Sequence, residues 1–215
     1  MTIRSKLYTA IVVVVAGFAV TVGVAAWAMN ELGDRFDDVQ RAADARALAL
    51  RLKFDVTDFN GWQTAYGYDG GESRPTYLAA FQRFQADLAT ARKALESPRE
   101  GALLDRIGDA ADDFDRLDAV AWSALRAGRA EQVRRIFLGP EIVNFRRAAT
   151  AAQQLAELED ANASAQERAF EDSRDDALRL LVGAAIVAAL LVVILLVTAT
   201  DLARQAERRL EPDDD

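Results

Sequence analysis

The sequence predicts an all-α protein, an antiparallel up-down four-helix bundle flanked by two transmembrane helices. Two long uncharged stretches lie near the two ends, and a polar region separates them. Within that region apolar residues recur at alternating spacings of three and four, which produces an apolar stripe on one helix face. Glycine and proline fall mostly between these repeats, where helices end. Such stripes are buried most readily against other helices.

Both uncharged stretches are long enough to cross a membrane. Leu7 to Asn30 contains 24 residues without a charge, and Leu180 to Thr200 contains 21. About 20 apolar residues in a helix span a hydrocarbon core of roughly 30 Å. We therefore expect five parts: a cytoplasmic N-terminus (1–6), a transmembrane helix (7–30), an extracytoplasmic domain (31–178), a second transmembrane helix (179–200) and a short cytoplasmic tail (201–215).

A cleaved secretory signal is the alternative for the first stretch. Two cations, Arg4 and Lys6, precede it, and Ala26-Trp27-Ala28 resembles a small-x-small cleavage site. The apolar core of a signal peptide is usually only about 7–15 residues long, which favours an uncleaved span.

Basic residues near the ends of the two stretches predict their orientation. Arg4 and Lys6 precede the first, and three arginines follow the second: Arg204, Arg208 and Arg209. Lysine and arginine close to a span are retained on the cytoplasmic side, whereas a long intervening domain crosses largely regardless of its charge. We expect a two-pass protein with both termini in the cytoplasm.

The region between the spans divides into helices at its glycines and prolines. The first helix is expected at 31–66 and ends before Gly67, and Pro75 opens a second that reaches Leu95. Ser97 and Glu100 flank Pro98 in the pattern of a capping box, which starts a third helix that stops near Gly128. A short helix at 130–137 ends at Gly139-Pro140. No proline or glycine follows between Pro140 and Gly183, so the last helix is expected to run unbroken into the second span.

Helix lengths predict how these elements are connected. Residues 31–66 would form a helix about 54 Å long and residues 141–178 one of about 57 Å, whereas the two helices between them would measure about 35–45 Å. Two long outer helices with a shorter hairpin between them form an up-down-up-down bundle.

Composition excludes several classes of function. The chain has no cysteine and no histidine, so thiolate nucleophiles, imidazole bases and the usual zinc sites are excluded. A net charge of −8 argues against binding to nucleic acid. We expect neither enzymatic activity nor a cofactor.

A group of aromatic and amide side chains ends the first long helix. Aromatic residues three and seven positions apart share a helix face, and amides lie beside them; an apolar pocket with a few polar groups uses such residues. The alternative is a core cap at the end of the bundle. The candidate ligand-binding residues are Phe59, Asn60, Trp62, Gln63 and Tyr66.

Two other patterns have plainer explanations. Four aspartates crowd one predicted helix at 112, 113, 115 and 118; they lack the loop of an EF-hand, so we expect a solvated face and no metal site. Small residues in the spans would allow helices to approach closely in lipid. Three explanations are open: these small residues join two copies in a homodimer, they pair the two spans of one chain, or they reflect an alanine-rich composition. The candidates for transmembrane packing are Gly17, Thr21, Ala25, Ala184 and Ala188.

The segment Asp58-Phe59-Asn60-Gly61-Trp62-Gln63-Thr64-Ala65-Tyr66 is similar to one in the four-helix-bundle sensors of actinobacterial receptors and cyclases. The expected order of membrane span, four-helix bundle and membrane span resembles the sensor module of bacterial methyl-accepting chemotaxis receptors. The same module precedes the output domains of histidine kinases and GGDEF diguanylate cyclases. The resemblance implies a membrane-bound sensory module of the bacterial cytoplasmic membrane that works as a homodimer and binds a small-molecule or protein stimulus. A membrane-anchored helical scaffold without a ligand is the alternative.

The chain departs from that family after the second span. A HAMP linker and an output domain follow the second span in such receptors, whereas here only residues 201–215 follow. We therefore expect the signal to pass to a separate signalling output protein.

Overall fold

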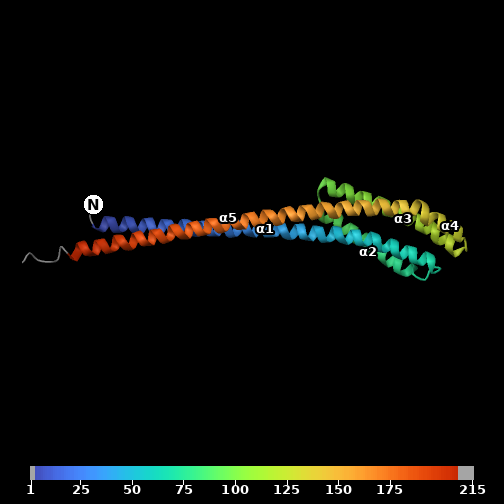
Figure 1. Ribbon diagram of the computed structural model, residues 1–215, viewed down its shortest axis with the longest axis horizontal. Helices are drawn as coiled ribbons and strands as arrows, with labels where there is room; N and C mark the ends of the chain where they lie inside the picture. The colour runs from blue at the N-terminus through green and yellow to red at the C-terminus, as the bar shows by residue number, and fades with distance from the viewer. Residues whose placement is uncertain (1–2, 208–215) are drawn as a thin grey trace, which may run out of the picture. The chain divides into compact units, whose positions relative to one another are not determined.

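The chain is all-helical over the residues that the structure, a computed structural model, describes. These are residues 3–207, so residues 1–2 of the expected N-terminus and 208–215 of the expected tail lie outside them. No strand occurs within this range. The elements in Figure 1 are α1 (Ile3–Tyr68), α2 (Arg74–Ala94), α3 (Pro98–Arg126), α4 (Ala130–Ile136), the π-helical turn η1 (Phe137–Glu141) and α5 (Ile142–Glu207).

The two longest helices each contribute to two compact units. Residues 39–166 form one unit, and the described parts of 1–38 and 167–215 form the other. Helix α5 runs unbroken through 66 residues, as the absence of proline and glycine after Pro140 predicted. Helix α1 is equally long and begins at Ile3, so no break separates the first apolar stretch from the helix expected at 31–66.

Local signals place the helix ends of the larger unit. The Ser97 side chain accepts a hydrogen bond from the Glu100 backbone N–H at 3.2 Å, and the Glu100 carboxylate accepts one from the Ser97 N–H at 3.0 Å. This confirms the capping box that starts α3. After α1, Gly70 and Gly71 adopt φ values of 74° and 106°, a left-handed conformation that favours glycine and turns the chain into α2.

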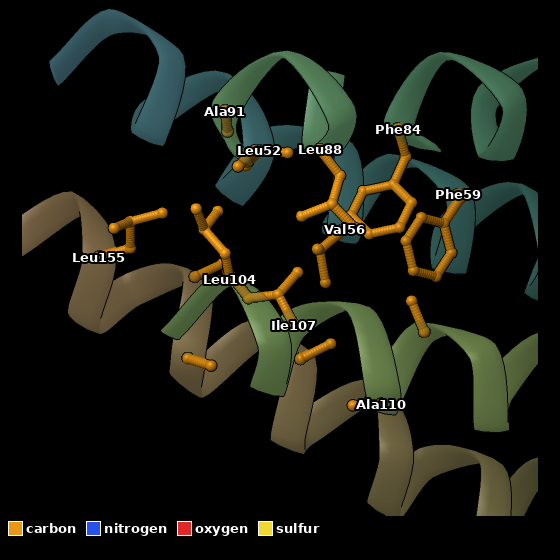
Figure 2. Close-up of a cluster of buried hydrophobic side chains, with 14 of the residues drawn as sticks. Leu52, Val56, Phe59, Phe84, Leu88, Ala91, Leu104, Ile107, Ala110 and Leu155 are labelled. Atoms are coloured by element: carbon orange, nitrogen blue, oxygen red, sulfur yellow. The ribbon is translucent and has the colours of Figure 1, made fainter. Parts of the chain in front are cut away.

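One apolar core joins four helical segments of the larger unit. Figure 2 shows part of it, with Leu52, Val56 and Phe59 of α1 facing Phe84 and Leu88 of α2, Leu104 and Ile107 of α3, and Leu155 of α5. The Phe59 ring meets three other phenylalanine rings edge-on, at centroid distances of 5.3, 5.2 and 5.2 Å: Phe81, Phe84 and Phe114. Such edge contacts add to the stability that area burial provides.

Segments of α1 and α5 pack against each other in the second unit. A Cβ atom added at Gly17 would collide with the Leu191 side chain, so the absence of a side chain permits this approach. Thr21, Ala25, Ala184 and Ala188 are half-buried in the same unit. The contact of Gly17 is therefore made within one chain.

Both α1 and α5 contain a stretch long and apolar enough to cross a membrane, judged by length and composition. In the most apolar 18-residue segment of each helix no residue is fully buried, although several are half-buried. Exposed apolar surface of this extent on a soluble helix would be unfavourable in water, because each exposed apolar side chain forgoes about 1.5–3 kcal/mol of burial.

A matched pair of phenylalanines on α1 tests the assignment of its buried face. Phe59 is fully buried, whereas Phe54 is 62% exposed. Replacing Phe59 with alanine should lower the free energy of unfolding by about 3–5 kcal/mol, because it leaves a cavity among aromatic rings. The same replacement at Phe54 should change it by about 0.5 kcal/mol or less. Denaturant unfolding of the two variants measures both values, and equal losses would show that α1 presents a different face to the core.

Candidate functional site

A pocket of about 420 Å³ lies in the larger unit where α5 begins, within the size range of small-molecule sites. Its wall is mainly apolar and is interrupted by a few polar side chains. Four elements supply most of it, namely α1, α4, η1 and the start of α5. The lining residues are Asn60, Gln63, Thr64, Gly67, Tyr68, Leu125, Ala130, Val133, Arg134, Phe137, Leu138, Glu141 and Ile142.

A break in the helix shapes this wall. Gly139 has φ −108° and ψ −110°, which is not helical, and Pro140 follows it inside the turn η1. Proline has no backbone N–H to donate, so the chain bends here before α5 continues. On the opposite wall, Gly67 leaves room for the Phe137 ring, because a Cβ atom there would overlap the ring.

Glu141 is the buried acid of the pocket. The break places its side chain inside, where only 1% of its surface is exposed. Gln63 Nε2 donates a hydrogen bond to Glu141 Oε1 at 2.6 Å. The second oxygen, Oε2, is buried and has no hydrogen-bond partner among the described residues.

Burial also changes the ionisation of Glu141. Its pKa is raised from 4.5 to about 8: desolvation is the largest cause and the nearby Asp118 adds to it, whereas the hydrogen bond from Gln63 and the charge of Arg74 oppose the shift. Desolvation dominates because a carboxylate loses more hydration than a carboxylic acid when it enters the protein. The Glu141 side chain is therefore mainly protonated at neutral pH.

A second buried polar group closes the same end of the unit. Asp118 is fully buried, accepts a hydrogen bond from the Tyr66 hydroxyl and forms an ion pair with Arg74 Nη1 at 2.5 Å. The Arg74 guanidinium lies 4.9, 5.0 and 4.9 Å from the ring centroids of Tyr66, Tyr77 and Trp122. Cation–π contacts with three rings and an ion pair hold this arginine in place. These contacts link α1, α2 and α3 at this end of the unit.

The prediction of a solvated aspartate face is therefore wrong at one position. Asp112 is exposed and Asp113 and Asp115 are half-buried, but Asp118 points into the unit. Burial is possible because Arg74 and Tyr66 compensate for the lost hydration of its carboxylate. The described part of the chain contains no group of three acidic side chains arranged to hold a metal ion.

The five candidate ligand-binding residues have different surroundings. Asn60 and Gln63 line the pocket. Phe59 and Tyr66 lie in the core, which is the alternative role that the sequence left open. Trp62 is 37% exposed and lies neither in the core nor on the pocket wall.

Sequence reasoning missed Glu141, although a signal was present. Glu141 lies four residues before Phe145, so the apolar seam of the last helix includes it, and it follows directly after the Gly139-Pro140 break. A charged residue at a seam position is rarely buried without a partner. The partner Gln63 lies 78 residues away, and only the fold shows the pair.

A second, shallower hollow of about 530 Å³ occurs between α3 and α5, and three charged residues line it: Arg99, Arg106 and Glu157. It contains no unpartnered buried polar atom of the described residues. The pocket beside Glu141 is therefore the stronger candidate site.

Comparisons with protein-family models, with curated proteins and with solved structures found no match to this chain.

The raised pKa of Glu141 predicts how stability depends on pH. Because its pKa is about 8 in the folded state and 4.5 ordinarily, the fold favours the protonated form. This contribution to the free energy of unfolding is complete below about pH 4.5 and is lost as the pH rises toward 8. Thermal unfolding from about pH 5 to about pH 8 should show a falling melting temperature, and Glu141→Gln should flatten that dependence. Glu157→Gln, an exposed change on α5, serves as the control and should leave the slope unchanged. An unchanged slope in Glu141→Gln would contradict the burial of this acid.

Proposed function

We propose that the chain is a membrane-bound extracytoplasmic sensory module of a bacterial cytoplasmic membrane, similar to the sensors of chemotaxis receptors. A stimulus binds in the pocket beside Glu141, and α5 transmits the change across the membrane to a signalling partner. The main support is the extent of α5. This helix begins at the pocket wall with Ile142 and continues unbroken through an apolar stretch long enough to span a bilayer.

The contacts of the larger unit support an up-down four-helix arrangement for this module. Tyr66 near the end of α1 meets Tyr77 near the start of α2 at 5.7 Å, and the earlier Phe59 meets the later Phe84 at 5.2 Å. As the residue number rises along α1, the number of its partner on α2 falls, which is the pattern of two antiparallel helices. Segments of α3 and α5 complete the same core. Two short connections and two long outer helices fit such a bundle.

The pocket wall also supports a role in switching. It joins α1 and α5, the two helices that contain the apolar stretches, through the short α4 and the bend at Gly139. A ligand that contacts both helices stabilises one packing of the pair over another. It shifts the equilibrium only by its difference in affinity for the two packings, commonly about 1–3 kcal/mol.

We propose binding in this pocket and not catalysis. Among the described residues Glu141 is the one acidic side chain that lines the pocket, and an amide holds it. General acid–base or nucleophilic chemistry generally needs at least two cooperating groups.

Site-specific labelling tests the topology of this proposal. The chain has no cysteine, so a single introduced cysteine is labelled uniquely. Glu72→Cys, in the turn between α1 and α2, should react with a membrane-impermeant maleimide in intact cells. Asp201→Cys should react only after the cells are permeabilised, because the C-terminal side faces the cytoplasm. The reverse labelling pattern, or labelling of both in intact cells, would exclude this topology.

A disulfide assay tests the coupling of pocket and spans. In Gly17→Cys/Leu191→Cys the two thiols replace groups that touch, so they should oxidise to a disulfide in membranes. Leu138→Trp, at the pocket rim, should partly fill the pocket and change the oxidation rate at least about twofold, because the spans follow α5. Val120→Trp, exposed on α3, is the matched control and should leave the rate unchanged. If Leu138→Trp also has no effect, the scaffold alternative would be favoured.

A further inference from the structure

The outer face of α1, on the side away from the core, has a regular row of exposed residues without a charge. Three of them are large and apolar: Leu50 is 46% exposed, Phe54 62% and Tyr68 89%. The row follows alternating spacings of four and three along about 38 Å of helix. We call it the outer row, and its members are Ala43, Ala47, Leu50, Phe54, Thr57, Gly61, Thr64 and Tyr68.

Another helix of the same unit shows what a solvated face of this chain looks like. On α3 an exposed row with alternating spacings of three and four also has eight members, and five of them are charged. They are Ala102, Asp105, Asp109, Asp112, Arg116, Ala119, Ser123 and Arg126. The outer row of α1 has no charged member. Depletion of charge distinguishes the centre of a protein interface from the remaining surface, so the outer row has the composition of a covered face.

The spacing of the outer row indicates that a helix covers it. Alternating spacings of three and four form the seam of a coiled coil, in which each side chain fits between four residues of the facing helix. An identical helix has the same spacing, and pairs of identical chains about a two-fold axis are the commonest assemblies. A second copy of α1 therefore fits the row.

Gly61 has no role within its own chain that requires a glycine. A glycine inside a helix costs up to about 1 kcal/mol relative to alanine. A Cβ atom added at Gly61 would meet nothing within 4 Å, so no neighbour in the chain occupies that space. A second helix that approaches the row closely would occupy it.

The charges beside the outer row favour two parallel copies. In a parallel pair, side chains that flank the seam on opposite sides meet across it and form salt bridges when their charges differ. Lys53 would meet Asp58 of the second copy in this way. Lys53 has no acidic partner among the described residues, and Arg83 of the same chain holds Asp58 in position at 2.6 Å.

One flanking pair has like charges. Arg46 would meet Arg51 of the second copy, which is unfavourable by itself. Each arginine already pairs with an aspartate of its own chain, and this reduces the repulsion. The pairs are Arg46 with Asp160 at 2.7 Å and Arg51 with Asp87 at 3.8 Å.

We propose that two copies of the chain pair side by side through the outer rows of α1, as a parallel two-fold coiled coil with Lys53 of each copy beside Asp58 of the other. The small residues of the spans do not supply this contact at Gly17, which packs on Leu191 of its own chain. The inference goes beyond the proposed function, and only its parallel direction rests on it, because copies inserted with one topology point the same way.

Cross-linking of single cysteines in native membranes tests the pairing, because the chain has no cysteine of its own. Identical positions of the outer row face each other across the two-fold axis. Leu50→Cys, Phe54→Cys and Thr57→Cys should therefore form disulfide-linked dimers under a mild oxidant. Two exposed alanines provide matched controls, Ala86→Cys on α2 and Ala119→Cys on α3. They should react at least about tenfold more slowly, because their sulfur atoms stay far apart.

A pair of threonine variants tests whether the row itself holds the copies together. Thr57→Glu places two like charges beside each other at the axis and should slow cross-linking at Phe54→Cys at least about tenfold. Thr150→Glu, an exposed change on α5, should leave the rate unchanged. Circular dichroism and melting temperature establish that each variant is folded.

A pair of lysine variants tests the direction of the pair. Lys53→Glu replaces attraction to Asp58 of the second copy with repulsion and should slow cross-linking at Phe54→Cys at least about threefold. Lys93→Glu makes the same change of charge at an exposed position of α2 and should have no effect.

Four results would overturn the inference: cross-linking at Ala119→Cys or Ala86→Cys as fast as in the outer row, no dimer at any of the three row positions, an unchanged rate in folded Thr57→Glu, or a cross-linked product whose mass is not twice that of the chain. An unchanged rate in folded Lys53→Glu would overturn the parallel direction. None of these results contradicts the sensory proposal, because labelling at Glu72→Cys and Asp201→Cys tests the topology of each copy separately.

Discussion

Phe59 fixes the orientation of α1, and the pocket depends on that orientation. Its ring is enclosed by phenylalanines from α2 and α3, so one face of α1 must point inward. Residues four and seven positions further along share that face. They are Gln63, which meets Glu141, and Tyr66, which meets Asp118. The apolar core thus positions the polar groups at the end of the same unit.

Buried acids make that end of the unit sensitive to its surroundings. Burial raises the pKa of Asp118, and its two partners, an arginine and a tyrosine hydroxyl, oppose that rise. Glu141 has only an amide, and its charged form is disfavoured. A protein retains an incompletely satisfied acid at a cost in stability, and such sites are often functional. The bend at Gly139 and Pro140 places this acid at the head of the helix that contains the second apolar stretch.

The sequence was most informative where the interaction is local. Apolar spacings, the Ser97 capping box and the Gly139-Pro140 break predicted the helices closely, because each depends on residues within a few positions. The extent of α1 was less evident, since no local signal distinguishes one continuous helix from two that abut. Burial of Asp118 and Glu141 could not be predicted, because their partners lie 52 and 78 residues away. Trp62 was expected to act together with Phe59 and Tyr66 because of its spacing from them, but its side chain remains partly exposed.

Infrared difference spectroscopy of Glu141 tests the central claim most directly, because it observes the protonation of the carboxyl group itself. In the native chain at pH 7, compared with Glu141→Gln, the spectrum should contain the C=O band of one additional protonated carboxylic acid. A Glu141 that is already ionised at pH 7 would contradict the account.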